Sequence, residues 1–164
     1  MVGLLLSALT TEVIGIHAIF GAFLMGVIIP ADSPLARQLV TKLEDVTVIV
    51  FLPVFFAFTG LRTRIGLLDS GTQWLVCVSI ILVATAGKFG GTLIGARIAR
   101  VSWKDATRLG ILMNTRGLME LIVLNVALDL GILSPILFTM MVVMAVVTTF
   151  MTSPLLDLTA GRSR

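Results

Sequence analysis

The chain has 164 residues, of which 57% are apolar and only 13% are charged, and its mean hydropathy is +1.09. Soluble domains carry about 25% charged residues, so the composition argues against a soluble enzyme. The net charge of +3 does not imply a nucleic-acid partner, because in a membrane protein the positions of the basic residues matter more than their sum.

Four stretches lack any Asp, Glu, Lys or Arg: 13–31, 46–61, 70–87 and 130–156. A membrane-spanning helix needs about 17–25 mostly apolar residues. The stretches are apolar on every face, whereas the strands of an outer-membrane barrel alternate apolar and polar residues. The pattern predicts an all-α fold class: a polytopic transmembrane helical bundle with about five full spans and an N-terminal stub.

The first span is expected at 13–30. Before it, the apolar segment 1–11 is too short to span the bilayer and is interpreted as the end of a helix whose beginning is missing. Ser33, followed by a proline, is a good N-cap for the next helix. Residues 35–46 carry charges on one face and apolar side chains on another, which predicts an amphipathic helix at the membrane surface.

The remaining spans are expected at 46–60, 73–97, 104–128 and 134–156. Pro53 is expected to kink the first of these spans, and Gly60 to close it. Ser102 and Ser134 are N-cap candidates for the last two. No repeat or linker to a soluble domain interrupts the chain, so 1–164 is expected to be one partial transmembrane domain.

The distribution of Lys and Arg among the loops predicts the orientation. Eight basic residues fall on one side: Arg37, Lys42, Arg97, Arg100, Lys104, Arg108, Arg162 and Arg164. The other side receives only Arg62 and Arg64. Because cytoplasmic loops are enriched in Lys and Arg, the loops at 31–45 and 97–108 and the C-terminus are expected in the cytoplasm.

Three ionisable residues fall inside the expected spans. Lys88 lies about 15 Å from either end of its helix, too deep for its ammonium group to reach water. Arg116 and Glu120 are four residues apart, so they can neutralise each other. The excess of one positive charge requires a neutral Lys88 or an acidic residue from outside this chain. Intramembrane charges mostly mark ion or substrate paths; a structural role for Lys88 or for the pair is the alternative.

The middle of the 104–128 helix is weak, because Asn114, Thr115 and Gly117 are poor helix formers. If the helix breaks there, Gly117 would cap its second half, with Glu120 at the third position. Discontinuous helices expose backbone carbonyls and helix ends to ions in many secondary transporters. The alternative is an unbroken helix with a small polar patch.

Three glycines recur every four residues on the 73–97 helix: Gly87, Gly91 and Gly95. Small residues at this spacing form a groove that another helix can approach closely. A role in helix packing is therefore expected for them.

Four segments resemble the second monovalent cation:proton antiporter family, with matching spacing over nearly all of the chain. They are GIHAIFGAFLMGVIIP (15–30), FLPVFFAFTGLRT (51–63), GKFGGT (87–92) and NTRGLMELIVLN (114–125). The family includes bacterial sodium/proton and potassium/proton antiporters, glutathione-gated potassium efflux transporters and plant cation/proton exchangers.

The resemblance implies that the chain is the C-terminal part of a sodium/proton exchanger-type transmembrane domain, the second half of an inverted-repeat antiporter fold with one discontinuous helix. The positions that match the family's second broken helix are Asn114, Thr115, Arg116, Gly117 and Glu120. Lys88 matches the core lysine that pairs with the ion-binding aspartate. That aspartate lies on the first broken helix, which this chain lacks.

The resemblance also implies a function: secondary antiport of sodium or potassium against protons by alternating access, in a bacterial plasma membrane. The implied partners are the cation, protons, the lipid bilayer, the missing N-terminal half and, when complete, a second copy. A ligand-gated potassium efflux system and a non-transporting scaffold or sensor are the alternatives. No enzyme, cofactor, metal or nucleic acid is expected, because no Ser/His, Asp/Asp or His/Glu arrangement recurs on facing spans.

Overall fold

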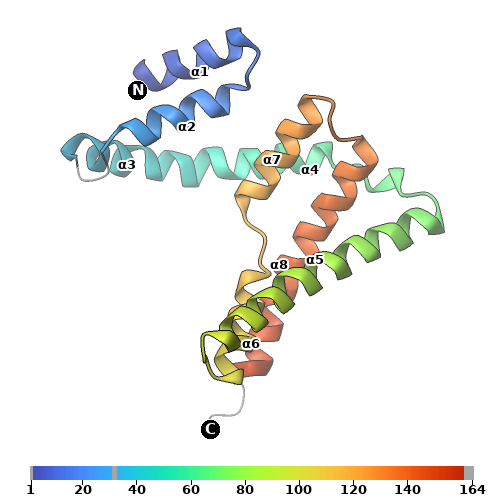
Figure 1. The fold of residues 1–164 in the computed structure, drawn as a ribbon. Helices are drawn as coiled ribbons and strands as arrows, with labels where there is room; N and C mark the ends of the chain where they lie inside the picture. The colour runs from blue at the N-terminus through green and yellow to red at the C-terminus, as the bar shows by residue number, and fades with distance from the viewer. Residues whose placement is uncertain (1, 31–32, 161–164) are drawn as a thin grey trace. The chain divides into compact units, whose positions relative to one another are not determined.

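The computed structural model describes residues 2–30 and 33–160. These residues form eight α-helices, one π-helical turn and one 3-10 turn, and they contain no strand (Figure 1). The expected all-α fold class is confirmed. The chain divides into two compact units, Met1–Phe58 and Thr59–Arg164.

The first unit begins with two short helices, α1 (Val2–Ile14) and α2 (Ala18–Ile28), which pack side by side (Figure 1). The structure thus has one helix over the expected stub at 1–11 and a second, shorter helix within the expected span at 13–30. The chain turns at Gly15, whose φ of 90° suits only glycine. The Glu12 carboxylate then accepts a hydrogen bond of 2.8 Å from the Ala18 amide, which satisfies one of the free N–H groups at the start of α2.

Close contact between α1 and α2 depends on Gly21. A Cβ atom at this position would clash with the Ser7 carbonyl oxygen and the Thr11 hydroxyl. The Ser7 hydroxyl donates a hydrogen bond of 2.7 Å to the Gly21 carbonyl. A glycine and a hydroxyl thus join the two helices, as is common where helices pack inside membranes.

The expected surface helix and the next span form one helical stretch, Ala36–Leu67. It comprises α3 (Pro34–Val46), the π-helical turn Thr47–Phe51 and α4 (Leu52–Arg62). The wider turn lies directly before Pro53, which lacks an N–H and crowds the carbonyl four residues earlier. Gly60 does not close the helix as expected, because α4 continues to Arg62.

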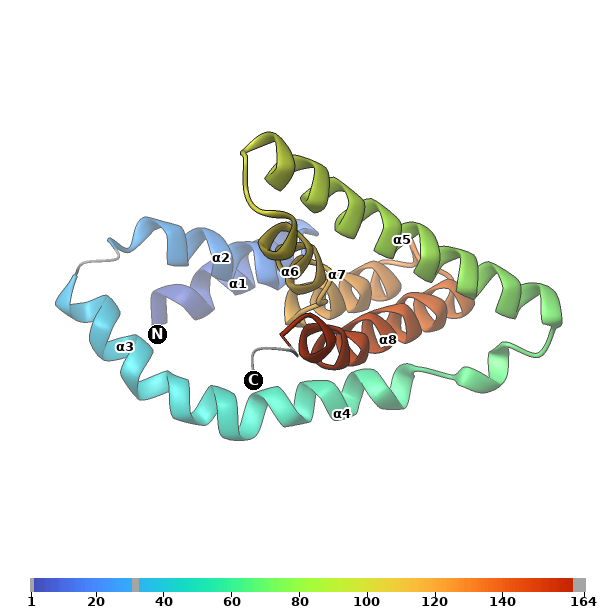
Figure 2. The same cartoon turned by 90° about the horizontal axis from the view of Figure 1, so that it is seen from below.

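The second unit contains four helices: α5 (Gly71–Ile98), α6 (Trp103–Met113), α7 (Leu118–Asp129) and α8 (Pro135–Ala160). Helix α8 packs against the other three, and Figures 1 and 2 both show it alongside α5. Its fully buried side chains include Phe138 and Met144. The helix extends beyond the expected end at 156 and includes the exposed Asp157.

Within residues 2–30 and 33–160, four helices are long and apolar enough to cross a membrane: Ala36–Leu67, Gly71–Ile98, Trp103–Asp129 and Pro135–Thr159. The third of these contains the interruption described below. The described residues also contain two shorter apolar helices, α1 and α2. Many large apolar side chains on these helices are exposed, as expected for surfaces that face lipid.

Candidate functional site

The expected 104–128 helix is interrupted at residues 114–117 (Figure 1). Helix α6 ends at Met113, and α7 begins at Leu118 after an extended Gly117 with φ −108° and ψ −177°. Glu120 is the third residue of α7, where a negative charge interacts favourably with the helix dipole. The interruption leaves backbone N–H and C=O groups without helical partners in the middle of an apolar segment.

An ion pair crosses this interruption. The Arg116 guanidinium Nη1 lies 2.9 Å from both carboxylate oxygens of Glu120. The side chains are 13% and 19% exposed, so both charges are largely removed from solvent. Arg116 lies in the extended segment and Glu120 in the helix, so the pair fixes the segment against the first turn of α7. The Arg116 Nε atom is buried and has no hydrogen-bond partner among the described residues.

Two threonines of α8 bind the interrupted segment. The Thr149 hydroxyl lies 3.1 Å from the Arg116 carbonyl oxygen, to which it can donate a hydrogen bond. The Thr152 and Thr115 hydroxyls are 2.9 Å apart. Thr149 thus reaches a backbone carbonyl that the break leaves without a helical partner, and the Thr115–Thr152 contact joins the segment to α8 through side chains. Sequence reasoning missed both α8 residues, although threonines at 148, 149 and 152 in an apolar helix were a signal.

Asn114 is the C-cap residue of α6 and is 4% exposed. Its Oδ1 atom has no hydrogen-bond partner among the residues that the structure describes. A buried amide oxygen normally has a partner. The break therefore contains one unused acceptor next to the Arg116–Glu120 pair in sequence.

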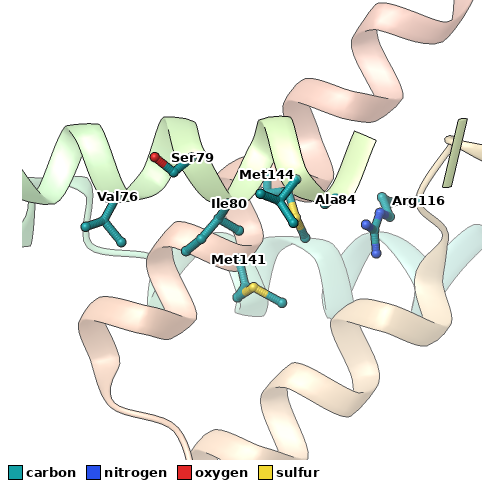
Figure 3. Close-up of a pocket in the computed structure, with 8 residues that line it drawn as sticks. Val76, Ser79, Ile80, Ala84, Arg116, Met141 and Met144 are labelled. Atoms are coloured by element: carbon teal, nitrogen blue, oxygen red, sulfur yellow. The ribbon is translucent and has the colours of Figure 1, made fainter. Parts of the chain in front are cut away.

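A pocket of about 430 Å³ lies where α5, α8 and the interruption meet (Figure 3). It is lined by Val76, Ser79, Ile80, Val83, Ala84, Arg116, Met141 and Met144. Figure 3 shows the α5 side chains along one wall and Arg116 at one end. Arg116 is the only charged residue in this lining. The pocket thus gives the interrupted segment access to space on the apolar surface of α5.

Lys88 lies on α5, four residues after the pocket residue Ala84, and is exposed. No hydrogen bond or ion pair of the residues described here involves its ammonium group. The structure therefore does not bring Lys88 into contact with Glu120, the acidic residue of the break.

The three glycines of α5 do not contact another helix in the described chain. Nothing lies within 4 Å of a Cβ atom built on Gly87, Gly91 or Gly95. The close approach of α5 and α6 instead occurs at Gly110, where a Cβ atom would lie 2.8 Å from the Phe89 ring. The packing role of the α5 glycines stays a prediction.

A second polar cluster joins α4 to α7. The Asn125 Nδ2 donates hydrogen bonds of 3.0 Å to the Thr59 hydroxyl and 2.9 Å to the Leu121 carbonyl. Arg62 donates a hydrogen bond of 3.3 Å to Asn125 Oδ1 and forms an ion pair of 2.6 Å with Asp129. Thr59 and Asn125 are 2% and 6% exposed. Sequence reasoning placed Arg62 in a loop and missed the cluster.

Comparison with known proteins gives consistent matches. A family model described as sodium/hydrogen exchanger, transmembrane, matches residues 1–158. The chain is 50% identical over 151 residues to the Na⁺/H⁺ antiporter NhaS4 of Synechocystis sp., covering 92% of this chain and 37% of that protein. It is 44% identical to cation/H⁺ antiporter 17 of Arabidopsis thaliana, covering 93% and 19%.

The K⁺/H⁺ antiporter 1 of Saccharomyces cerevisiae is 39% identical, over 93% of this chain and 18% of that protein. The chain thus spans between 18% and 37% of the length of these relatives. All three are transporters by name, not enzymes. The resemblance seen in the four sequence segments is confirmed, and with its apolar helices the chain is an integral, multi-pass membrane protein that belongs to the transmembrane sodium/hydrogen exchanger family.

Proposed function

We propose that the complete protein exchanges a monovalent cation, sodium or potassium, for protons by alternating access, and that this chain is the C-terminal part of its transport domain. The interrupted α6–α7 helix, with a charged pair at the break, is the observation that carries the proposal. Antiporters for Na⁺ and for K⁺ among the relatives support the substrate class and leave both ions open.

The break contributes oxygen atoms and a fixed pair of charges to the ion path. Asn114 provides an unused amide oxygen, and Thr115 a hydroxyl held by Thr152. Arg116 and Glu120 neutralise each other, so the segment stays in the membrane interior at low electrostatic cost. Gly117 has an extended backbone directly before α7. The α8 threonines hold this geometry while an ion passes.

Lys88 is the charge-compensating residue. A lysine deep in a membrane helix needs an acidic partner, and the described residues offer it none. The partner is the ion-binding carboxylate of the other half of the inverted repeat, supplied by the rest of the complete protein. The carboxylate binds a cation or a proton when loaded and Lys88 when empty, so cation binding and proton binding are competitive.

The remaining features of the proposal concern orientation and assembly. The eight-to-two distribution of basic residues supports a cytoplasmic C-terminus. The complete protein is a homodimer in a bacterial plasma membrane. Within each complete protein, the glycine face of α5, formed by Gly87, Gly91 and Gly95, packs against a helix of the N-terminal half of the inverted repeat.

Reconstitution of the complete protein in liposomes with an imposed pH gradient tests the proposal. Sodium or potassium chloride should dissipate the gradient, while choline chloride at the same concentration should not. The 164-residue chain alone should behave like empty vesicles, because the ion-binding carboxylate is absent from it. A complete protein whose gradient responds equally to choline and to both alkali cations would refute antiport.

A further inference from the structure

A groove of about 340 Å³ lies at the end of α5 and the start of α6, at the opposite end of α6 from the break. Its lining consists of Leu93, Ile94, Arg97, Ile98 and Trp103. Three of the five residues are aliphatic, one is a tryptophan and one is a cation. The groove thus combines an apolar wall with a single charged group.

The charged group is fixed in place. The Arg97 guanidinium stacks on the Trp103 ring, with its central carbon 4.4 Å from the ring centre. Its Nη1 donates a hydrogen bond of 2.6 Å to the Val101 carbonyl. A guanidinium has five N–H donors, and no other partner is present among the described residues. Arg97 therefore keeps donors for an external anion and loses little side-chain entropy when it binds one.

The surroundings of the groove are strongly basic. Residues 97–108 contain four cations, Arg97, Arg100, Lys104 and Arg108, and a single acidic residue, Asp105. The Asp105 carboxylate accepts a hydrogen bond of 2.7 Å from the Ser102 hydroxyl and forms an ion pair of 4.0 Å with Arg108. The loop therefore has an excess of positive charge that is not neutralised within this segment.

The groove lies where two membrane-spanning helices meet the lipid headgroups. The membrane-spanning helix Gly71–Ile98 ends beside it, and the next, Trp103–Asp129, begins there. This is the level of the lipid headgroups, where tryptophan is enriched. A phospholipid places its phosphate and its acyl chains on the two sides of this boundary. The arrangement of Arg97 and Trp103 above Leu93 and Ile94 offers groups suited to both parts.

We propose that this groove binds an anionic phospholipid of the surrounding membrane. The Arg97 guanidinium binds the phosphate through its free N–H groups, Arg100 and Lys104 favour a net negative headgroup, and Ile94 and Ile98 contact an acyl chain. Guanidinium–phosphate hydrogen bonds are among the strong ones in proteins, and basic sites next to membrane helices are typical of anionic lipid recognition. The site is separate from the proposed ion path.

Fluorescence quenching of the complete protein tests the lipid contact. Phosphatidylglycerol with brominated acyl chains, added to detergent-solubilised protein, should quench the emission of Trp103. The quenching should fall in Trp103→Phe but not in Trp74→Phe, which changes the tryptophan at the opposite end of α5. Brominated phosphatidylcholine with the same chains should quench much less. Equal quenching by both lipids, or equal quenching of the two variants, would overturn the proposal.

Native mass spectrometry tests the role of Arg97. In Arg97→Gln the apparent affinity for phosphatidylglycerol should fall about tenfold or more, the effect of losing one charge-assisted contact. Arg64→Gln, an exposed basic residue outside the groove, is the matched control and should bind like wild type. An equal loss of affinity in both variants would mean that the lipid responds only to the total positive charge of the protein, and would refute the proposal. Competition by free glycerol phosphate at the lipid's own concentration would mean a phosphate site without a lipid, and would equally refute the proposal.

Discussion

Replacing Glu120 by Gln should be far more harmful than replacing both members of the Arg116–Glu120 pair. The guanidinium Nη1 lies 2.9 Å from each carboxylate oxygen, and the side chains are only 13% and 19% exposed. Glu120→Gln leaves a largely buried cation without its counter-charge. Removing one partner of a buried pair costs about 3–5 kcal/mol, whereas neutral replacement of both often costs little.

The distance and burial of the pair also predict how strongly the Arg116 and Glu120 substitutions are coupled. Because both groups keep some exposure, we expect a coupling free energy of about 1–3 kcal/mol. The assay is unfolding of the complete protein in mixed micelles titrated with dodecyl sulfate, on wild type, Glu120→Gln, Arg116→Gln and the double variant. Arg64→Gln combined with Glu120→Gln is the control cycle, because these side chains share no contact in the structure.

The outcome that refutes this reasoning is additivity. If the Arg116→Gln and Glu120→Gln effects sum to that of the double variant within about 0.3–0.5 kcal/mol, the two charges do not interact in the membrane. The 2.9 Å contact would then not stabilise the break. Coupling in the control cycle as large as in the test cycle would also invalidate the interpretation.

Three further predictions concern other parts of the chain. Asn125→Leu should lower the unfolding free energy by about 1–3 kcal/mol, because it leaves buried partners without hydrogen bonds; no loss in the micelle titration would contradict this. A maleimide added outside the cell should label Asp69→Cys and not Lys104→Cys, and the reverse pattern would invert the topology. Lys88→Ala in the complete protein should shift the pH of half-maximal exchange upward, because losing a nearby cation raises a carboxylate's pKa; an unchanged pH profile would remove the role assigned to Lys88.

The break at 114–117 could be predicted from the sequence because its cause is local. Asn114, Thr115 and Gly117 favour non-helical backbone, and Glu120 three residues after Gly117 is typical of a helix start. The four-residue spacing of Arg116 and Glu120 indicated the ion pair, although the pair forms across the break and not along one helix. The starts of the helices capped by Ser33 and Ser102 could be predicted for the same reason, because the capping residues are close in sequence to the groups they bind.

The turn at Gly15 could not be predicted in this way. The stretch 13–31 that contains Gly15 has no Asp, Glu, Lys or Arg, so charge content alone favours one helix through the glycine. The two helices are joined by the close approach at Gly21 and by the hydrogen bond from Ser7 to the Gly21 carbonyl. No periodicity within α1 or α2 reveals that two short helices pack together.

The cluster at Asn125 also depends on tertiary structure. Thr59 and Asn125 are 66 positions apart, and only the folded chain brings them together. The same holds for Thr149, which lies 33 positions from Arg116. Such contacts need the packing of α8 and α4 on α7, which a single sequence does not specify.

Proton uptake driven by a cation gradient alone tests the central claim most directly. Liposomes containing the complete protein and loaded with sodium or potassium chloride are diluted into choline chloride at equal pH on both sides, with a pH-sensitive dye inside. Antiport predicts that the lumen becomes acidic as the cation leaves, and that vesicles loaded with choline do not. A lumen whose pH stays constant with both alkali cations, or changes equally with choline inside, would contradict cation:proton exchange.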